Sequence, residues 1–139
     1  MQGKVKVRKQ QLNYFRKLAR ESSKEICAYL LGEIVSPTLT RIGKFHYPAE
    51  FLEQTESSVR PTTAAWETAK LAAEEQGLRI VGTIHSHPDW VPIMSPSDYK
   101  GHIEDGDRVS AIVGKNGQRT RVYFWTVESA LPLEIEYVP

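Results

Sequence analysis

The stretch Arg79-Ile80-Val81-Gly82-Thr83-Ile84-His85-Ser86-His87-Pro88 predicts a buried strand with a chemical site at its end. Its short apolar run leads directly into the first histidine, which is typical of a strand in the interior of a sheet. Because side chains alternate along a strand, His85 and His87 should lie on one face and Ser86 on the other. Two imidazoles on a stiff strand end would supply half of a metal site.

A third metal ligand is available in Ser95-Pro96-Ser97-Asp98, which follows His87 after a loop containing prolines. Ser95 suits a helix N-cap, Pro96 suits the first helical position, and Asp98 can complete a capping box. This structural role would explain the segment by itself, but it is compatible with metal binding. A helix starting here would hold Asp98 rigidly, with one carboxylate oxygen free to face the histidines. Three protein ligands are typical of a catalytic zinc site, whose fourth position holds water.

The ordered combination His-Ser-His-Pro, six residues, then Ser-x-x-Asp resembles the signature of the JAMM family of zinc metalloproteases, also called MPN+ or JAB. That family also has a glutamate opening a strand of the type Glu-x-Cys-Gly-x-Leu-x-Gly. The similar stretch here is Glu25-Ile26-Cys27-Ala28-Tyr29-Leu30-Leu31-Gly32, with Ala28 in place of the usual glycine. Glu25 is therefore the natural match, and Glu21, on a helical face four residues earlier, is its rival.

The resemblance implies a stand-alone domain of the prokaryotic or phage type, spanning residues 1–139. Its implied fold is α/β, a single MPN-type domain with a curved mixed β-sheet flanked by helices, distantly similar to cytidine deaminases. One Zn²⁺ per chain would be held by His85, His87 and Asp98. Glu25 would assist the attack of zinc-bound water, and Ser95 would donate a hydrogen bond to the carbonyl oxygen.

The substrate implied by the resemblance is the peptide or isopeptide bond after the C-terminal tail of a ubiquitin-like or sulfur-carrier protein. Two other classes are possible: a non-catalytic MPN scaffold, and another zinc hydrolase related to the cytidine deaminases. Scaffold relatives lack the zinc ligands, which are all available here. The deaminases need a Pro-Cys-x-x-Cys motif, whereas this chain has one cysteine. The complete residue set favours the protease.

Length and composition predict one soluble domain, because 139 residues with 40% hydrophobic and 25% charged side chains are ordinary globular values. The net charge of +1 argues against a broad surface for nucleic acid or anionic membranes. The alternating stretch 1–8 predicts a strand rather than a signal peptide, and no apolar run approaches the ~20 residues of a membrane helix. Cys27, the single cysteine, predicts a buried strand position and a reducing, cytoplasmic location. No oligomeric state is predicted.

Periodicity predicts the remaining elements. Helices are expected over 9–22, 62–76 (ended by Gly77) and 96–103. Strands are expected over 1–8, 25–35, 40–47, 79–87, 109–113, 121–127 and, at an edge, 133–138. A turn is expected at Lys115-Asn116-Gly117, and the acidic segment 48–61 is expected to be irregular. The predicted core includes Leu12, Phe15, Leu18, Ala19, Ile42 and Phe45.

Other side chains give weaker signals. His46 is expected within a strand, and His102 on the exposed side of the Asp98 helix. Trp90 has two equal interpretations, lining the approach to the zinc or packing over that helix. A solvated turn around Gly106 is expected for the acidic residues Glu104, Asp105 and Asp107.

Overall fold

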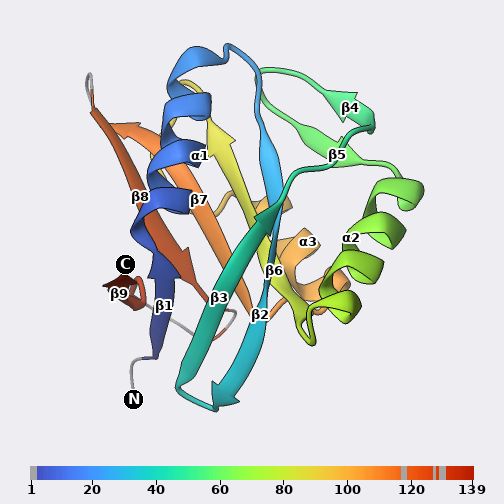
Figure 1. Cartoon of the computed structure of the whole chain (residues 1–139). Helices are drawn as coiled ribbons and strands as arrows, with labels where there is room; N and C mark the ends of the chain where they lie inside the picture. The colour runs from blue at the N-terminus through green and yellow to red at the C-terminus, as the bar shows by residue number, and fades with distance from the viewer. Residues whose placement is uncertain (1–2, 117–118, 127, 129–130) are drawn as a thin grey trace.

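The computed structural model describes residues 3–116, 119–126, 128 and 131–139. Its elements, in chain order, are β1 (Lys4–Arg8), α1 (Lys9–Glu21), β2 (Cys27–Ser36), β3 (Leu39–His46), β4 (Phe51–Gln54), β5 (Val59–Pro61), α2 (Thr63–Glu75), β6 (Arg79–His87), α3 (Pro96–Asp105), β7 (Val109–Asn116), β8 (Arg119–Trp125) and β9 (Glu134–Val138). Seven strands form one sheet in the order β8-β7-β6-β2-β3-β1-β9, and β4 and β5 form a separate pair (Figure 1).

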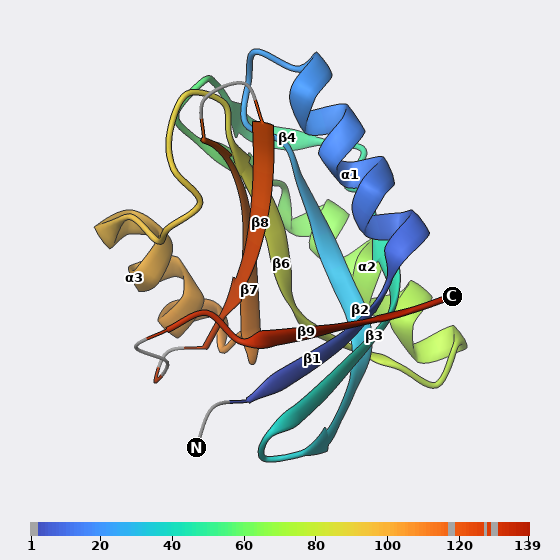
Figure 2. The ribbon, with the colours of Figure 1, turned by 90° about the vertical axis from the view of Figure 1, so that its left-hand side faces the viewer.

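The sheet is mixed, and the strand that ends in the two histidines lies inside it. β6 pairs with β2 in the antiparallel direction and with β7 in the parallel direction. At the far edge β1 pairs with both β3 and β9 in parallel. Figure 2 shows how strongly the sheet twists, with β1 and β9 running across the direction of β7 and β8. The predicted α/β fold with a curved mixed sheet is confirmed.

Alternation along β2 divides the core between the two faces of the sheet. Leu30 belongs to the main core, where it is buried together with Leu12, Phe15 and Ala19 of α1. Leu31, the next residue, packs in a second cluster on the other face, with Ala69 and Ala73 of α2. Figure 1 shows α1 and α2 on either side of β2 and β6. A strand with apolar residues on both faces is what the continuous apolar run in β2 predicts.

The same alternation determines which face carries the histidines. Ile84 is fully buried in the main core under α1, so its neighbours His85 and Thr83 point to the opposite face. That opposite face is the one covered by α3, which Figure 2 shows on the side of β6 and β7 away from α1. The fold therefore brings the end of β6 and the first turn of α3 together on one side of the sheet.

Most sequence predictions agree with these elements, with small shifts at their ends. The predicted core residues Ile42 and Phe45 are buried, as is Cys27, and His46 ends β3 as expected. β9 is an edge strand, as predicted. The prediction for 48–61 was wrong, because this segment contains the antiparallel β4–β5 pair. The two strands could not be predicted from the sequence because a short exposed ribbon has no buried face. It therefore lacks the alternation of apolar and polar residues by which strands are recognised.

Parts of two predictions lie outside the described residues, namely Gly117 of the expected turn and Val127 of the expected strand 121–127. Among the described residues, no helix is long and apolar enough to cross a membrane.

The packing of α1 can be tested with two adjacent aromatic residues. Phe15 is fully buried, whereas Tyr14 is 53% exposed and touches Tyr47 edge to face. We expect Phe15→Ala to lower the free energy of unfolding by about 3–5 kcal/mol through lost burial and the resulting cavity. Tyr14→Ala should cost about 1 kcal/mol or less. Urea unfolding measures both, and equal losses would contradict this assignment of the buried face.

Candidate metal centre

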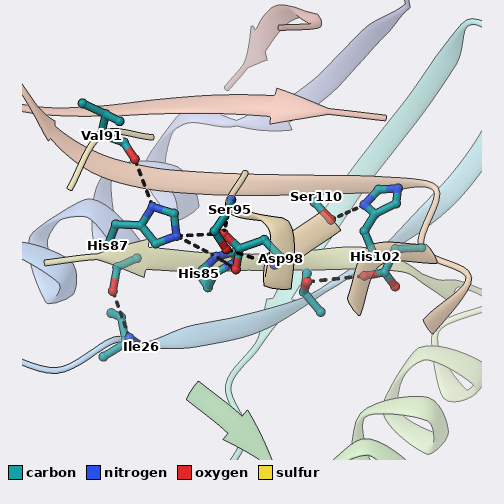
Figure 3. A network of polar contacts seen from close by, with 11 residues as sticks. Ile26, His85, His87, Val91, Ser95, Asp98, His102 and Ser110 are labelled. Atoms are coloured by element: carbon teal, nitrogen blue, oxygen red, sulfur yellow. Dashed lines mark hydrogen bonds and ion pairs between the residues drawn. The ribbon is translucent and has the colours of Figure 1, made fainter. Parts of the chain in front are cut away.

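Three potential ligand atoms converge where β6 ends against α3. The Nε2 atoms of His85 and His87 are 3.2 Å apart. Asp98 reaches both imidazoles, with Oδ1 3.1 Å from His85 Nε2 and Oδ2 3.0 Å from His87 Nε2. Figure 3 shows the three side chains pointing toward one another. The predicted trio is therefore brought together, and it is the one group of potential metal ligands found among the described residues.

These separations suit an ion with the metal–ligand distances and the ligand types of zinc. Ligands at Zn–N and Zn–O distances of 2.0–2.2 Å in a tetrahedron lie about 3.3–3.6 Å from each other. The observed separations of 3.0–3.2 Å are slightly shorter, so the side chains would move apart by a few tenths of an ångström to admit an ion. Two imidazoles and one carboxylate also match the three-ligand composition of catalytic zinc sites.

Asp98 is held in place by the start of its own helix. Its backbone N–H donates to Ser95 Oγ at 3.0 Å, and its Oδ2 accepts from the Ser95 N–H at 3.0 Å. These reciprocal bonds are the predicted capping box, with Pro96 in the first turn. Burial would raise the pKa of Asp98, but hydrogen bonds from His85 and His87 and the Ser95 N–H hold it well below its usual range. The carboxylate is thus ionised and rigid, as a ligand must be.

His87 is oriented by the loop that follows it. Its Nδ1 donates to the carbonyl of Val91 at 2.9 Å, which leaves Nε2 with its lone pair toward the site when the ring is neutral. Burial disfavours the charged ring, but the hydrogen bonds to Asp98 and Val91 produce a raised pKa overall. Protons therefore compete with a metal ion for this nitrogen, and metal affinity should fall in acid.

The loop can approach His87 because residue 114 of β7 is a glycine. A Cβ atom at Gly114 would overlap the backbone of Trp90, Val91 and Pro92. The absence of a side chain therefore lets the loop lie directly on β7, with the Val91 carbonyl within reach of the imidazole.

Glu25 lies just before β2 and is nearly buried, at 7% exposure. Its backbone N–H donates to the Thr55 carbonyl at 2.7 Å, and its own carbonyl accepts from Gln54 Nε2 at 3.1 Å. Burial raises the pKa of its carboxyl group, while the nearby His85 and His87 act in the opposite direction. Glu25 is thus a carboxyl group close to the candidate ligands with a pKa shifted upward. Glu21, the alternative candidate for the catalytic glutamate, is the last residue of α1 and is exposed.

Glu25 and the three candidate ligands line one cleft of about 980 Å³, together with Ser95 and Trp90. Trp90 is 46% exposed, and its ring centroid is 5.1 Å from that of His87. Of its two interpretations, lining the approach to the site is the one that the structure supports. The Ser95 hydroxyl accepts the helix-capping bond, so its own hydrogen is free to be donated into the cleft.

Two weaker predictions beside the site were wrong. His102 is buried at 3% exposure rather than exposed, because α3 turns this face toward β7, where its Nδ1 contacts Ser110 Oγ. Burial lowers the pKa of His102, because it disfavours the charged imidazole. Asp107 is half-buried and accepts from Thr83 Oγ1, and burial followed by the charge of Asp105 raises its pKa to about 7. Glu104 and Asp105 are exposed, as expected.

Several residues that support the site carry no sequence signal strong enough to identify them. Ser86 was correctly predicted to point away from the histidines, but its role was missed. Its Oγ accepts the N–H of Ile26 at 2.9 Å, and its own N–H donates to the Ile26 carbonyl, which attaches the segment carrying Glu25 to β6. The Val91 carbonyl and Gly114 were missed because they act through backbone contacts between distant segments.

The chain belongs to a family of known proteins, the prokaryotic homologs of the JAB domain, which it matches over residues 8–128. This confirms the resemblance noted from the sequence. No functionally curated protein matches the chain.

Solved structures show the same fold at low sequence identity. A protein from Desulfitobacterium hafniense superimposes with a TM-score of 0.75 at 20% identity, covering 96% of this chain and 92% of that one. A protein from Salinibacter ruber has a TM-score of 0.60 at 23% identity, covering 87% of this chain and 80% of that one.

The ligand assignment predicts metal content. The wild-type protein should contain about one zinc ion per chain, and His87→Ala should lose most of it, since two ligands remain. Elemental analysis after dialysis measures this. His46→Ala, on β3 outside the site, is the matched control and should keep its zinc. Full occupancy in His87→Ala would contradict the assignment.

Proposed function

We propose that this protein is a zinc-dependent peptidase that cleaves the peptide or isopeptide bond after the C-terminal tail of a ubiquitin-like or sulfur-carrier protein. The observation that carries the proposal is the convergence of His85, His87 and Asp98 within 3.2 Å in a cleft that also contains Glu25. A non-catalytic scaffold would need neither the ligand geometry nor the buried glutamate. The lone buried cysteine and the reducing compartment it suits support a cytoplasmic location.

His85, His87 and Asp98 would hold the metal ion. Bound zinc would supply Lewis acidity and would lower the pKa of a water molecule to about 7. Two of these side chains are preorganised for this role, because the capping box fixes Asp98 and the Val91 carbonyl fixes His87. Little reorganisation would then be needed when an ion enters.

Glu25 would carry the proton. Hydrolysis requires a group that takes a proton from the attacking water and later delivers it to the departing amine. A carboxyl group whose pKa is raised by burial is suited to both steps, since it accepts a proton more readily than an exposed carboxylate and can release it again. The hydrogen bonds from Gln54 and to Thr55 attach the backbone of Glu25 to the end of β4 and the residue after it.

Ser95 would stabilise the charge that develops on the carbonyl oxygen. Its Oγ accepts from the Asp98 N–H, which orients the hydroxyl at the start of α3 and leaves its proton available. One such donor can contribute ~3 kcal/mol to the transition state of acyl transfer.

We expect the cleft to bind an extended peptide tail. It continues from the metal site along Val59, Arg60 and Pro61 of β5. Because β4 and β5 form a sheet of only two strands in the described structure, a peptide could add a third strand there. Glycine at the cleaved position would allow the closest approach of the backbone to the site.

Replacing the proposed proton carrier should separate chemistry from metal binding. We expect Glu25→Gln to keep about one zinc per chain and to lose nearly all hydrolysis, at least ~100-fold in kcat. Glu21→Gln, at the exposed end of α1, is the matched control and should behave as wild type. A silent Glu25→Gln combined with a damaged Glu21→Gln would overturn the assignment.

The Ser95 hydroxyl should affect both rate and stability. Ser95→Ala should slow turnover by roughly 10²-fold through the lost donor, and should cost ~1 kcal/mol of stability through the lost cap. Single-turnover kinetics and urea unfolding measure the two effects. Unchanged turnover with a loss of stability would restrict Ser95 to its capping role.

The proposed preference for glycine at the cleaved position can be tested with substrates that differ only in their C-terminal tails. The zinc-loaded protein should cleave a reporter fused to a ubiquitin-like protein ending in Gly-Gly, and should slow by at least ~10-fold when both glycines are replaced by valine. Trp90→Ala should raise KM more than it lowers kcat, because the exposed ring lines the cleft. Equal cleavage of both tails, or of unstructured casein, would indicate a general peptidase.

A further inference from the structure

The helix that carries Asp98 is attached to the sheet by very little apolar surface. α3 contains a single buried residue, His102. Its large apolar side chains face outward, with Tyr99 at 43% and Ile103 at 52% exposure. Figure 2 accordingly shows α3 standing out from the sheet. Hydrophobic burial therefore does little to fix the position of this helix, and polar contacts must do so.

Besides the contacts of Asp98 with the two histidines, α3 has a polar contact with the sheet through His102. This residue lies one turn after Asp98 on the same side of the helix, because residues four apart share a face, and both side chains line the cleft. Its Nδ1 contacts the Oγ of Ser110, a residue of β7 that is itself 5% exposed (Figure 3). Ser110 is the register partner of Thr83, two residues before His85 on β6. The contact thus joins the Asp98 helix to the part of the sheet that carries the histidines.

A histidine at position 102 lowers the stability of the fold, which suggests that it has another role. Among the described residues, the buried Nε2 of His102 has no hydrogen-bond partner. A buried nitrogen without a partner destabilises a fold, so an apolar side chain of similar size would serve better if stability alone mattered. What an apolar side chain cannot provide is a directional bond that specifies where the helix stands.

We propose that His102 is a positioning residue, which holds α3 against β7 through Ser110 so that Asp98 meets His85 and His87. This inference rests on the proposed metal centre. Without the His102–Ser110 contact, α3 would sample other positions, and the metal ion would have to select the competent one. The apparent zinc affinity would then equal the intrinsic affinity multiplied by the fraction of molecules in which α3 is correctly placed.

The test is zinc affinity, measured by chelator competition on the whole protein. His102→Leu removes the directional bond and keeps a similar volume, and Ser110→Ala removes the same bond from the sheet side. Each should weaken zinc binding by about 3- to 10-fold, the range expected when one net hydrogen bond is lost. His102→Asn can present an amide near the position of Nδ1, and should restore affinity to within about twofold of wild type.

A second readout separates positioning from general destabilisation. In the metal-free variants, hydrogen exchange should accelerate at the amides of α3 while those of β6 stay protected. Ile103→Ala, on the exposed face of the same helix, is the control and should change neither zinc affinity nor exchange in β6. If His102→Leu does not fold, Ser110→Ala carries the test.

The outcomes distinguish a failure of the metal centre from a failure of the positioning role of His102. A wild-type protein that binds no zinc would overturn the metal centre and this inference together. A wild-type protein that binds zinc, with Ser110→Ala and His102→Leu binding equally tightly, would overturn the positioning role alone. So would a loss of affinity in His102→Leu that His102→Asn does not restore.

Discussion

The site depends on the approach of two imidazoles at the end of one interior strand. Alternation along β6 places His85 and His87 on the same face, and neighbouring strands on both sides keep that strand end from moving. With the Nε2 atoms 3.2 Å apart, both rings direct a nitrogen at the same point, where one metal ion could contact both. Asp98 supplies the negative charge, and the capping box, the Val91 carbonyl and Gly114 all serve to maintain this arrangement.

Two carboxyl groups of the cleft, Asp98 and Glu25, have opposite electrostatic environments. Asp98 accepts hydrogen bonds from both imidazoles and the Ser95 N–H, which keeps its pKa low despite burial. Glu25 is also nearly buried, but burial dominates and its pKa is raised. A permanently ionised group suits a ligand, whereas a group with a raised pKa suits a proton carrier. The two carboxyl groups thus have opposite pKa shifts because their hydrogen-bond partners differ, and these shifts agree with the roles proposed for them.

Local patterns in the sequence predicted most of the helices and strands, whereas the resemblance to the JAMM family implied the curved mixed sheet and the grouping of Asp98 with the two histidines. Strand periodicity orients His85 and His87, and helix-capping chemistry places Asp98, so short stretches of sequence suffice. The supporting contacts could not be predicted in this way. Ser86 bonds Ile26 sixty residues away, and Gly114 accommodates a loop more than twenty residues earlier, so each depends on the tertiary fold. His102 was predicted to be exposed because α3 lacks a clear apolar face, and the sequence gives no sign of its contact with Ser110 eight residues later.

The central claim is that β6 and α3 together form a metal centre beside Glu25. The most direct measurement is a crystal structure of the zinc-loaded protein, with anomalous data collected on both sides of the zinc absorption edge. We predict one anomalous peak per chain, at about 2.0–2.2 Å from His85 Nε2, His87 Nε2 and a carboxylate oxygen of Asp98. The Glu25 carboxyl group should lie nearby without binding the ion. A loaded crystal with no peak at these three side chains, or with Glu25 as a ligand in place of Asp98, would contradict the claim.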